Sequence, residues 1–143
     1  MTFPAPQSGP SGGPFGRAPE DVEVREVMRP GVVAVPEDAS VLEARRAMLS
    51  HGVHAVLVVA HAHGRPMGLV TARGLLAWID RDETAGYARD AISQAPVWIQ
   101  PGASLRDAAR ALIEPGITHL LVRRRDEEMP EGVVTARDLL ARG

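Results

Sequence analysis

The chain contains no cysteine and no lysine, and these two absences remove several kinds of chemistry. Without cysteine there is no disulfide framework, no thiol nucleophile and no thiolate zinc site. All 16 basic residues are arginine, which also excludes Schiff-base lysines and the phosphate-binding lysine of P-loops. Only two Trp, one Tyr and two Phe occur, too few for an aromatic platform on which nucleic-acid bases stack.

The chain also has no excess of positive charge and no long apolar segment. Its formal net charge is −2, which disfavours nucleic-acid binding through phosphate contacts. The longest apolar run, residues 53–60, is interrupted by His54 and is far too short to span a membrane. We see no cationic segment followed by an apolar core near the start, and therefore expect no secretory signal, no membrane association and a cytoplasmic protein.

The first residues differ in composition from the rest of the chain. Residues 1–19 consist mainly of Pro, Gly and Ser, which bury too little apolar surface to offset the entropy lost on ordering. We therefore predict a disordered tail over residues 1–20. It serves either as a flexible tether or as an arm that binds a partner.

The remainder is one unit written twice. Shifting the sequence by 64 residues aligns GLVTARGLLA at 68–77 with GVVTARDLLA at 132–141, without a gap. Two copies are too few for a solenoid. About 60 residues form only a marginal core, so we expect the repeats, residues 21–83 and 84–143, to pack by pseudo-twofold symmetry as one module.

Each repeat shows the order β-α-β-β-α, which predicts a mixed α/β (α+β) fold. Short apolar runs at 32–35 and 97–99 begin the repeats, and β-rich runs follow at 53–59 and 117–122. Second strands at 68–70 and 132–134 lead into final helices that start at Thr71 and Thr135.

Local signals mark the first helix of each repeat. Ser40 and Ser104 each stand three residues before an acidic residue, the pattern of a capping box at a helix start. Gly52 and Gly116 stand where a left-handed helix end is expected. In the first helix, the spacing predicts a core-facing stripe formed by Val41, Ala44, Met48 and Leu49.

Two motifs, in phase with this repeat, resemble those of the CBS-domain family. They are GVHAVLVV at 52–59 and GVVTARD at 132–138, and the resemblance covers residues 21–143. It implies the tandem arrangement called a Bateman module, in which the Gly-φ-φ-Thr-x-x-Asp motif holds the ribose of a nucleotide. The ligands implied are AMP, ADP, ATP or S-adenosylmethionine, and no cofactor is required.

The residues of the second motif suit such a ligand physically. Thr135 at a helix start leaves backbone N–H groups free for an anion, and the Asp138 carboxylate can accept from both hydroxyls of a ribose. Arginine pairs well with phosphate oxygens, which makes Arg137 a candidate phosphate ligand. The same Thr-x-x-Asp spacing also forms an ordinary capping box, and that interpretation stays open.

The resemblance further implies that a cleft takes its ribose motif from one repeat and its adenine cage from the other. The cage beside Asp138 would then come from the first repeat, with Val133 under the base or sugar. Apart from His54, all of these residues are equally consistent with plain core packing. The predicted cage residues are Met28, Val33, Val53, His54 and Ala55.

The first copy of the motif departs from the pattern. Gly74 stands where the ribose carboxylate should be, which removes both the ribose acceptor and the reciprocal helix cap. We therefore predict one competent cleft per chain and one degenerate cleft, unless Gly74 leaves room for a bulkier ligand. The degenerate cleft would comprise Thr71, Gly74, Val97, Ile117, Thr118 and His119.

The histidines give no convincing metal site. His61 and His63 lie in a predicted loop, and His51 and His54 flank a helix end, without the three or four converging ligands that a metal requires. No nucleophile–base pair or Gly-rich phosphate loop occurs either. We therefore predict neither a metal site nor an enzyme.

The sequence thus favours a regulatory module that binds an adenosine nucleotide and acts on an unknown protein partner in trans. The resemblance implies a homodimer formed through the helices, for which we expect Met48, Leu139 and Leu140 to be exposed apolar positions. The main alternative is a dimerisation or protein-interaction module without a small ligand. A nucleic-acid binder and a metal-dependent enzyme are further alternatives.

Overall fold

The computed structural model describes residues 17–141, so residues 1–16 of the predicted tail lie outside the described part of the chain. The last residues of that tail contact the third α-helix, α3 (Leu105–Ile113). The Leu105 N–H donates to the Pro19 carbonyl at 3.1 Å, and Arg106 pairs with Glu20 at 3.0 Å. The chain therefore enters the fold against its second half.

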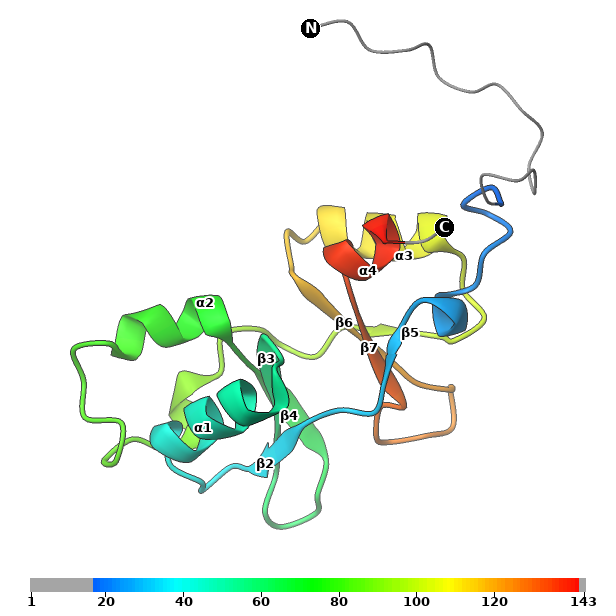
Figure 1. Cartoon of the computed structure of the whole chain (residues 1–143). Coiled ribbons are helices and arrows are strands. Elements are labelled where there is room, and N and C mark those ends of the chain that lie inside the picture. Colours follow the sequence, from blue (N-terminus) through cyan, green and yellow to red (C-terminus); the bar gives the residue numbers. More distant parts are fainter. Residues whose placement is uncertain (1–16, 142–143) are drawn as a thin grey trace, which may run out of the picture.

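The first half is a three-stranded sheet with helices packed on it (Figure 1). Its strands run in the order β2-β3-β4, with β2 parallel to β3 and β3 antiparallel to β4. The elements are β2 (Ala34–Pro36), α1 (Val41–His51), β3 (Ala55–Val59), β4 (Pro66–Thr71), α2 (Ala72–Leu75) and the 3₁₀ helix η2 (Leu76–Trp78).

The second half repeats this plan with one additional strand. Its order is β1-β7-β6-β5, with β5 parallel to β6 and the other neighbours antiparallel. Both halves therefore confirm the predicted β-α-β-β-α order and the α+β class. The elements are β1 (Arg29–Pro30), β5 (Trp98–Ile99), α3, β6 (His119–Val122), β7 (Gly132–Thr135) and α4 (Ala136–Leu140).

Most helix boundaries follow the predicted local signals. The Ser40 hydroxyl accepts from the Glu43 N–H while the Glu43 carboxylate accepts from the Ser40 N–H, a complete capping box. Ser104 caps α3 in one direction only. Gly52 and Gly116 adopt the left-handed conformation, with φ of 64° and 65°, because glycine enters this region without strain. Gly52 is the C-cap of α1, but α3 already ends at Ile113 with Glu114 as its C-cap, so the predicted helix end at Gly116 is wrong.

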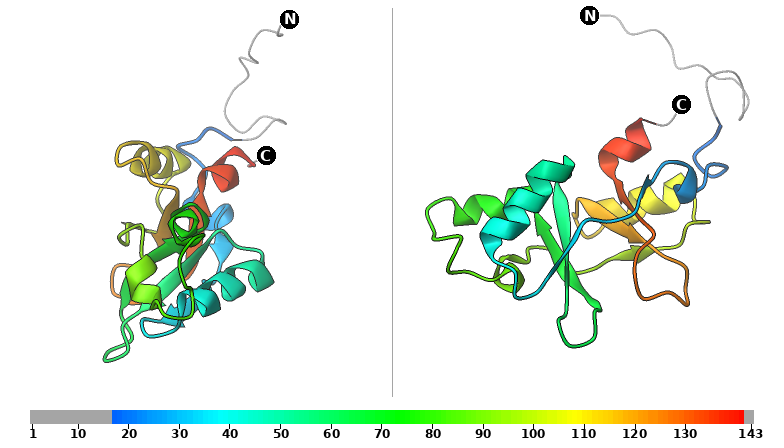
Figure 2. Two further views of the ribbon diagram at one scale, coloured as in Figure 1. Left: turned by 90° about the vertical axis from the view of Figure 1, so that its left-hand side faces the viewer. Right: turned by 60° about the horizontal axis from the view of Figure 1, so that its bottom comes forward.

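The two halves exchange their leading segments. The 3₁₀ helix η1 (Val24–Glu26) packs on the second half, where the Val24 N–H donates to the Ala103 carbonyl at 2.8 Å. Its counterpart 64 residues later, η3 (Ala88–Ala91), packs on the first half, where the Ala88 N–H donates to the Ala39 carbonyl at 2.7 Å. Figure 2 shows the segment after residue 17 running along the second half before it crosses to the first. This exchange joins the repeats into one module.

Three predictions about individual apolar residues are wrong. Leu49 is not part of the core stripe of α1 but is 68% exposed, and Leu139 is buried rather than exposed. Met48 is buried, which confirms its place in the core stripe and contradicts its expected exposure on a dimer face. At about 100° per residue, Leu49 lies about 80° from Val41 on the side away from Ala44, and so it turns away from the sheet. Leu140 is 79% exposed, as predicted.

The sheets meet in a small core between the halves, formed by Leu57, Leu69 and Leu121. Each of these side chains is at most 1% exposed. We expect Leu121→Ala to lower the free energy of unfolding by about 2–5 kcal/mol, because the cavity lies where both halves contact it. Urea denaturation followed by circular dichroism measures this loss. Two separate transitions in the wild type would contradict a single cooperative module.

Candidate functional site

Thr135 and Asp138 lie where β7 ends and α4 begins. The Thr135 N–H and hydroxyl both donate to Oδ2 of Asp138, at 2.9 and 3.0 Å. The Asp138 N–H in turn lies 3.3 Å from the Thr135 hydroxyl, so the pair forms a capping box. The local interpretation of this spacing as a cap is therefore correct.

This cap leaves half of the carboxylate unused. Only Oδ2 of Asp138 takes part in the box, and Oδ1 has no hydrogen-bond partner within residues 17–141. The residue is half-buried. A fixed carboxylate with one free oxygen can accept hydrogen bonds from the hydroxyls of a bound molecule. The cap therefore orients Asp138 without using all of its acceptor capacity.

The equivalent position of the first half is arranged differently. Thr71 caps α2 by accepting from the Gly74 N–H at 3.0 Å, and no carboxylate is present. Instead, the Ser93 hydroxyl accepts from the Thr71 N–H at 3.3 Å and shares a hydrogen bond with the Thr71 hydroxyl at 2.8 Å. Ser93 thus takes the local hydrogen bonds that Asp138 takes in the second half. The reciprocal cap is missing, as the sequence predicted.

Ser93 also fills the space beside Gly74. A Cβ atom added to Gly74 would lie 2.6 Å from the Ser93 Cβ and closer still to its hydroxyl oxygen. The space that a side chain at position 74 would enter is therefore occupied by Ser93. The sequence did not indicate Ser93, which stands in the connection between the repeats.

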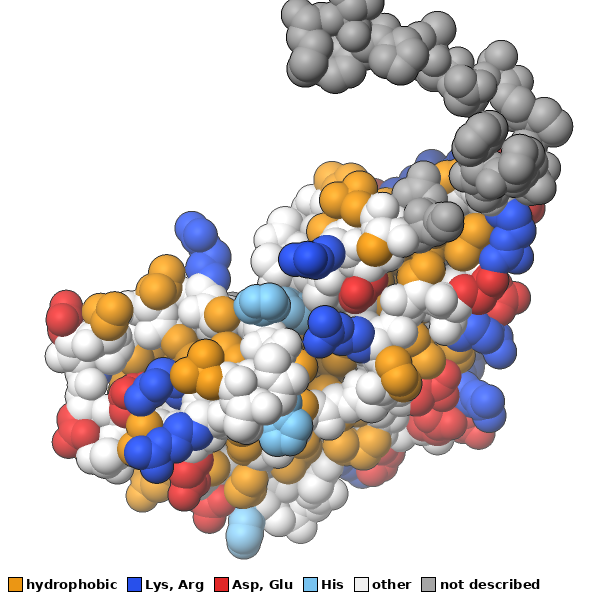
Figure 3. Space-filling view, in the orientation of Figure 1, with side chains coloured by type: hydrophobic (Ala, Val, Ile, Leu, Met, Phe, Trp, Pro, Cys, Tyr) orange, Lys and Arg blue, Asp and Glu red, His pale blue; other side chains and the backbone are white. Residues whose placement is uncertain are grey.

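The predicted cage residues sit at the edges of the two cores. Met28, Val33, Val53 and Ala55 are half-buried, and each packs against a core cluster on one side. His54 is exposed, and its carbonyl accepts from the Ala72 N–H at 2.8 Å. Figure 3 shows the surface hollowed between the two halves, with a histidine on the floor of the hollow.

Strand pairing in the second half places Val133 and His119 on β7 and β6, near the hollow between the two halves. Val133 pairs with Arg29 of β1 and with Leu121 of β6, and it is half-buried. His119 lies opposite Thr135 in the ladder between β6 and β7. Burial lowers the pKa of His119, the charge of His54 lowers it further, and the charge of Asp138 raises it. His54 and Asp138 therefore both lie within electrostatic reach of His119.

The buried His119 makes the stability depend on pH. Because its pKa is lower in the folded state than its ordinary value of 6.5, the unfolded chain takes up a proton first as the pH falls. The stability it contributes is therefore present above 6.5 and is lost as the pH falls through the folded-state pKa. We expect the melting temperature to drop between about pH 7.5 and about pH 5.5, and to drop less in His119→Gln. An equal drop in both proteins would contradict this role.

A family comparison identifies this arrangement. The family described as "CBS domain" matches the chain twice, at residues 24–81 and 88–142. The chain belongs to the CBS-domain family. CBS domains are generally regulatory modules rather than enzymes, and the two matches correspond to the two sequence repeats.

Two relatives match most of the chain at low sequence identity. The CBS pair is 26% identical over 122 residues to the uncharacterized protein MK0525 of Methanopyrus kandleri, covering 83% of this chain and 61% of that protein. Against MJ1225 of Methanocaldococcus jannaschii, it is 27% identical over 118 residues, 82% of this chain and 41% of that one. The chain thus spans about three-fifths and two-fifths of the lengths of these relatives.

Solved structures with bound nucleotide have the same architecture. The CBS-domain protein PAE2072 of Pyrobaculum aerophilum, complexed with AMP, matches with a TM-score of 0.73 at 22% identity, covering 82% of this chain and 89% of that one. The CBS domain of a bacterial CNNM/CorC family Mg²⁺ transporter, in complex with ATP, matches at 0.71 and 20%, covering 85% and 86%. At such identities these likenesses establish the fold alone.

Three of the residues predicted for the degenerate cleft of the CBS pair have structural partners. Val97 and Ile117 pack against the core of the second half. The Thr118 hydroxyl lies 2.7 Å from Nδ1 of His119. Gln94, which the sequence did not indicate, holds this strand by donating to the His119 carbonyl at 2.8 Å. These residues therefore have a packing role whether or not a ligand binds.

The remaining candidates lie at the surface. Arg137 is exposed in the first turn of α4 and has no ion-pair partner among the described residues. His61 lies 3.8 Å from an Asp38 carboxylate oxygen, and Nδ1 of His63 accepts from the Arg65 N–H. Within residues 17–141, no three His, Asp or Glu side chains are grouped so as to hold a metal ion. In the same part of the chain, none of the helices has the length and apolar character needed to cross a bilayer.

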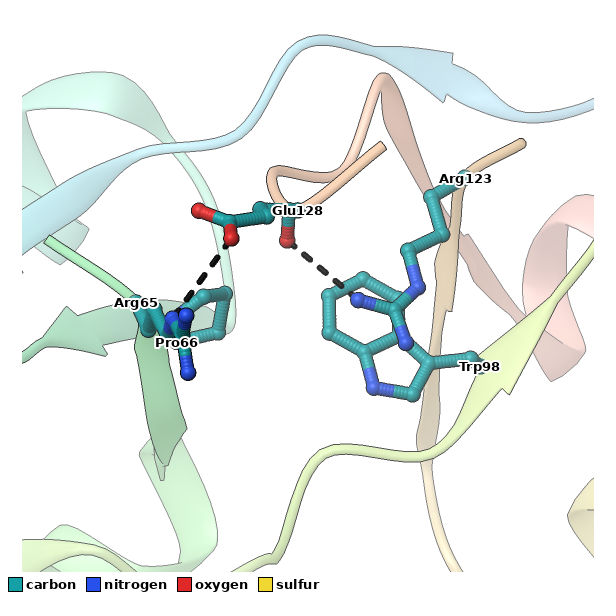
Figure 4. A pocket seen from close by; sticks show the side chains of 5 residues that line it. All are labelled: Arg65, Pro66, Trp98, Arg123 and Glu128. Atoms are coloured by element: carbon teal, nitrogen blue, oxygen red, sulfur yellow. Dashed lines mark hydrogen bonds and ion pairs between the residues drawn. The ribbon is translucent and has the colours of Figure 1, made fainter. Parts of the chain in front are cut away.

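Two further hollows lie away from this cleft, at the opposite end of strand β6. One has a volume of about 360 Å³ and lies between the halves, lined by Arg65, Pro66, Trp98, Arg123 and Glu128 (Figure 4). The other has a volume of about 700 Å³ and lies along β5. Neither contains a residue of the predicted nucleotide site.

Proposed function

We propose that this CBS pair is a regulatory module that binds an adenosine-containing ligand beside Thr135 and Asp138 and acts on a partner protein in trans. The observation that carries the proposal is the Asp138 carboxylate, which is held in place by Thr135 and keeps Oδ1 free. AMP or ATP is bound in two proteins of the same fold. Those proteins support an adenine nucleotide as the ligand class.

The proposed ligand lies between the two halves. Its ribose hydroxyls donate to Asp138, and its base contacts the half-buried side chains of Met28, Val33 and Val133. The backbone of residues 53–55 is available to the edge of the base. The phosphate group is directed to the start of α4, where Arg137 is exposed, because backbone N–H groups and guanidinium both favour an anion.

A thermal-shift panel with AMP, ADP, ATP and S-adenosylmethionine tests this proposal. A ligand that binds only the folded state stabilises it by about 2.7 kcal/mol at 100 times its dissociation constant. We expect at least one of the four to raise the melting temperature by several degrees. If none of them does so at millimolar concentration, the nucleotide proposal is wrong.

A second candidate function is that of a dimerisation module, and one observation favours it. The helices expose large apolar side chains at equivalent positions of both halves: Leu49 corresponds to Ile113, and Leu76 corresponds to Leu140. These side chains are 62–79% exposed. Matched apolar positions on both pairs of helices suit a self-complementary interface between two copies of the chain.

We expect a homodimer that the double variant Ile113→Glu/Leu140→Glu converts to a monomer. A charge placed in an apolar interface remains unpaired when two copies associate. Sedimentation velocity measures the change, and circular dichroism checks that the fold is kept. The matched control is Met129→Glu, since Met129 is an exposed apolar residue outside the helices. A wild type that sediments as a monomer would contradict the interface.

A further inference from the structure

The end of the second sheet farthest from Asp138 carries a stacked Trp–Arg pair. The Arg123 guanidinium lies 3.6 Å from the centre of the Trp98 ring. Among residues 17–141, the guanidinium makes one hydrogen bond, a long one of 3.4 Å to the Glu128 carbonyl. Figure 4 shows the guanidinium over the indole, with Glu128 reaching toward Arg65 on the other side. Most N–H donors of Arg123 thus remain available.

Two more arginines belong to the same surface. The hollow of about 700 Å³ along β5 is lined by Trp98, Arg123 and Arg125 and contains no acidic residue. Arg125 has no ion pair or hydrogen bond within residues 17–141. At the rim, a guanidinium nitrogen of Arg25 lies 3.2 Å from where a Cβ of Gly102 would be. Arg25 is paired with Glu23 at 2.6 Å, so the unpaired positive charge beside the half-buried Trp98 comes from Arg123 and Arg125.

The fold itself does not require these residues, because the first repeat provides an internal comparison. There, the aromatic and the two arginines are replaced by Ala34, Val59 and His61, 64 residues earlier. Glu37 and Asp38 of the first repeat stand where the second has Pro101 and Gly102. Glu37 pairs with Arg89 at 3.6 Å, the equivalent of Arg25.

The same end of the sheet also offers an open strand edge. Strand β5 is the outer strand of its sheet and is paired only with β6. Backbone groups on such an edge can pair with an extended segment of another chain. The equivalent edge strand of the first half, β2, ends in Pro36, which lacks an N–H. At β5 the corresponding residue is Gln100.

We propose that the β5 edge, with Trp98, Arg123 and Arg125, binds an extended acidic peptide segment of a partner protein. The arginines bind its carboxylates, Trp98 contacts an apolar side chain, and the strand edge pairs with its backbone. Charge complementarity selects this occupant: the surface is basic and aromatic in a chain whose net charge is −2, and Trp and Arg are typical anchors of protein interfaces. The surface does not use Asp138, so this proposal and the nucleotide proposal fail separately.

Fluorescence anisotropy with a labelled peptide of alternating Glu and Val tests the proposal, at about 50 mM salt where screening is moderate. The uncharged probe is the same peptide with Gln in place of Glu. We expect Arg123→Gln and Arg125→Gln each to weaken binding of the acidic peptide at least about tenfold, because each removes a charged hydrogen-bond donor to a carboxylate. Asp138→Ala should bind the peptide like the wild type.

Two more variants sharpen the test. Glu128→Gln removes the carboxylate that pairs with Arg65 at 3.5 Å in the smaller hollow, and it should tighten binding of the acidic peptide. Arg110→Gln removes an exposed arginine of α3 that lies outside both hollows, and it should change nothing. The proposal is overturned if Arg110→Gln weakens binding as much as Arg123→Gln does. It is equally overturned if single-stranded oligothymidylate binds this surface more tightly than the peptide.

Discussion

Asp138→Ala is expected to abolish nucleotide binding by the CBS pair. The substitution removes the carboxylate at the start of α4 whose Oδ1 is left free by the cap. Two hydrogen bonds from ribose hydroxyls to a charged acceptor contribute about 3–6 kcal/mol, so the affinity should fall at least about 100-fold. Isothermal titration of both proteins with the ligand found in the thermal-shift panel measures this change.

The substitution also removes a helix cap, and that effect needs its own control. Loss of such a cap costs about 0.5–2 kcal/mol of stability. Glu43→Ala removes the acidic member of the capping box of α1 and leaves the cleft unchanged. We expect Glu43→Ala to lose comparable stability and to keep full affinity for the nucleotide. If it loses affinity to the same extent, the effect of Asp138→Ala comes from destabilisation rather than from a lost contact.

Gly74→Asp is expected to destabilise the protein, although it restores the sequence motif of the second repeat. The new Cβ would lie 2.6 Å from the Ser93 Cβ, and rotation of the Ser93 hydroxyl does not relieve that contact. Overpacking of this kind costs about 1–3 kcal/mol. Urea denaturation measures the loss.

The double variant Gly74→Asp/Ser93→Gly tests whether the contact with Ser93 causes the loss of stability, or whether position 74 accepts no side chain at all. Removing the Ser93 side chain vacates the space, and the new carboxylate then accepts from the Thr71 N–H, as Asp138 does from Thr135. We expect the double variant to recover at least half of the stability lost by Gly74→Asp. A double variant as unstable as the sum of the two single variants would show that Ser93 does not substitute for the carboxylate.

Most of the fold could be predicted because its signals are local and occur twice. The helix starts at Ser40 and Ser104 follow from side chains that bond their own backbone three residues away. The end of α1 at Gly52 follows from a conformation that favours glycine. Because the unit occurs twice, each element could be predicted from two copies of its pattern. The family resemblance is confirmed by the match of the family to both repeats.

The predictions failed or were incomplete where the outcome depends on contacts between distant segments. Whether Leu49 is exposed depends on which side of α1 the sheet covers. Its spacing from Val41 and Ala44 predicted a place in the core-facing stripe of α1, but Leu49 is exposed. The role of Ser93 became visible only when the connection between the repeats was placed beside Thr71. His119 was assigned to the degenerate cleft from its position in the repeat, but the structure brings it within electrostatic reach of Asp138.

The number of nucleotides bound per chain tests the central claim most directly. Calorimetric titration of the wild type with the adenine nucleotide that stabilises it gives this number. One ligand per chain is expected, because only the second half supplies a carboxylate at the ribose position while Ser93 fills the equivalent space in the first. Two ligands per chain would contradict the prediction that the first cleft is degenerate, and no bound ligand would leave dimerisation as the better account of this CBS pair.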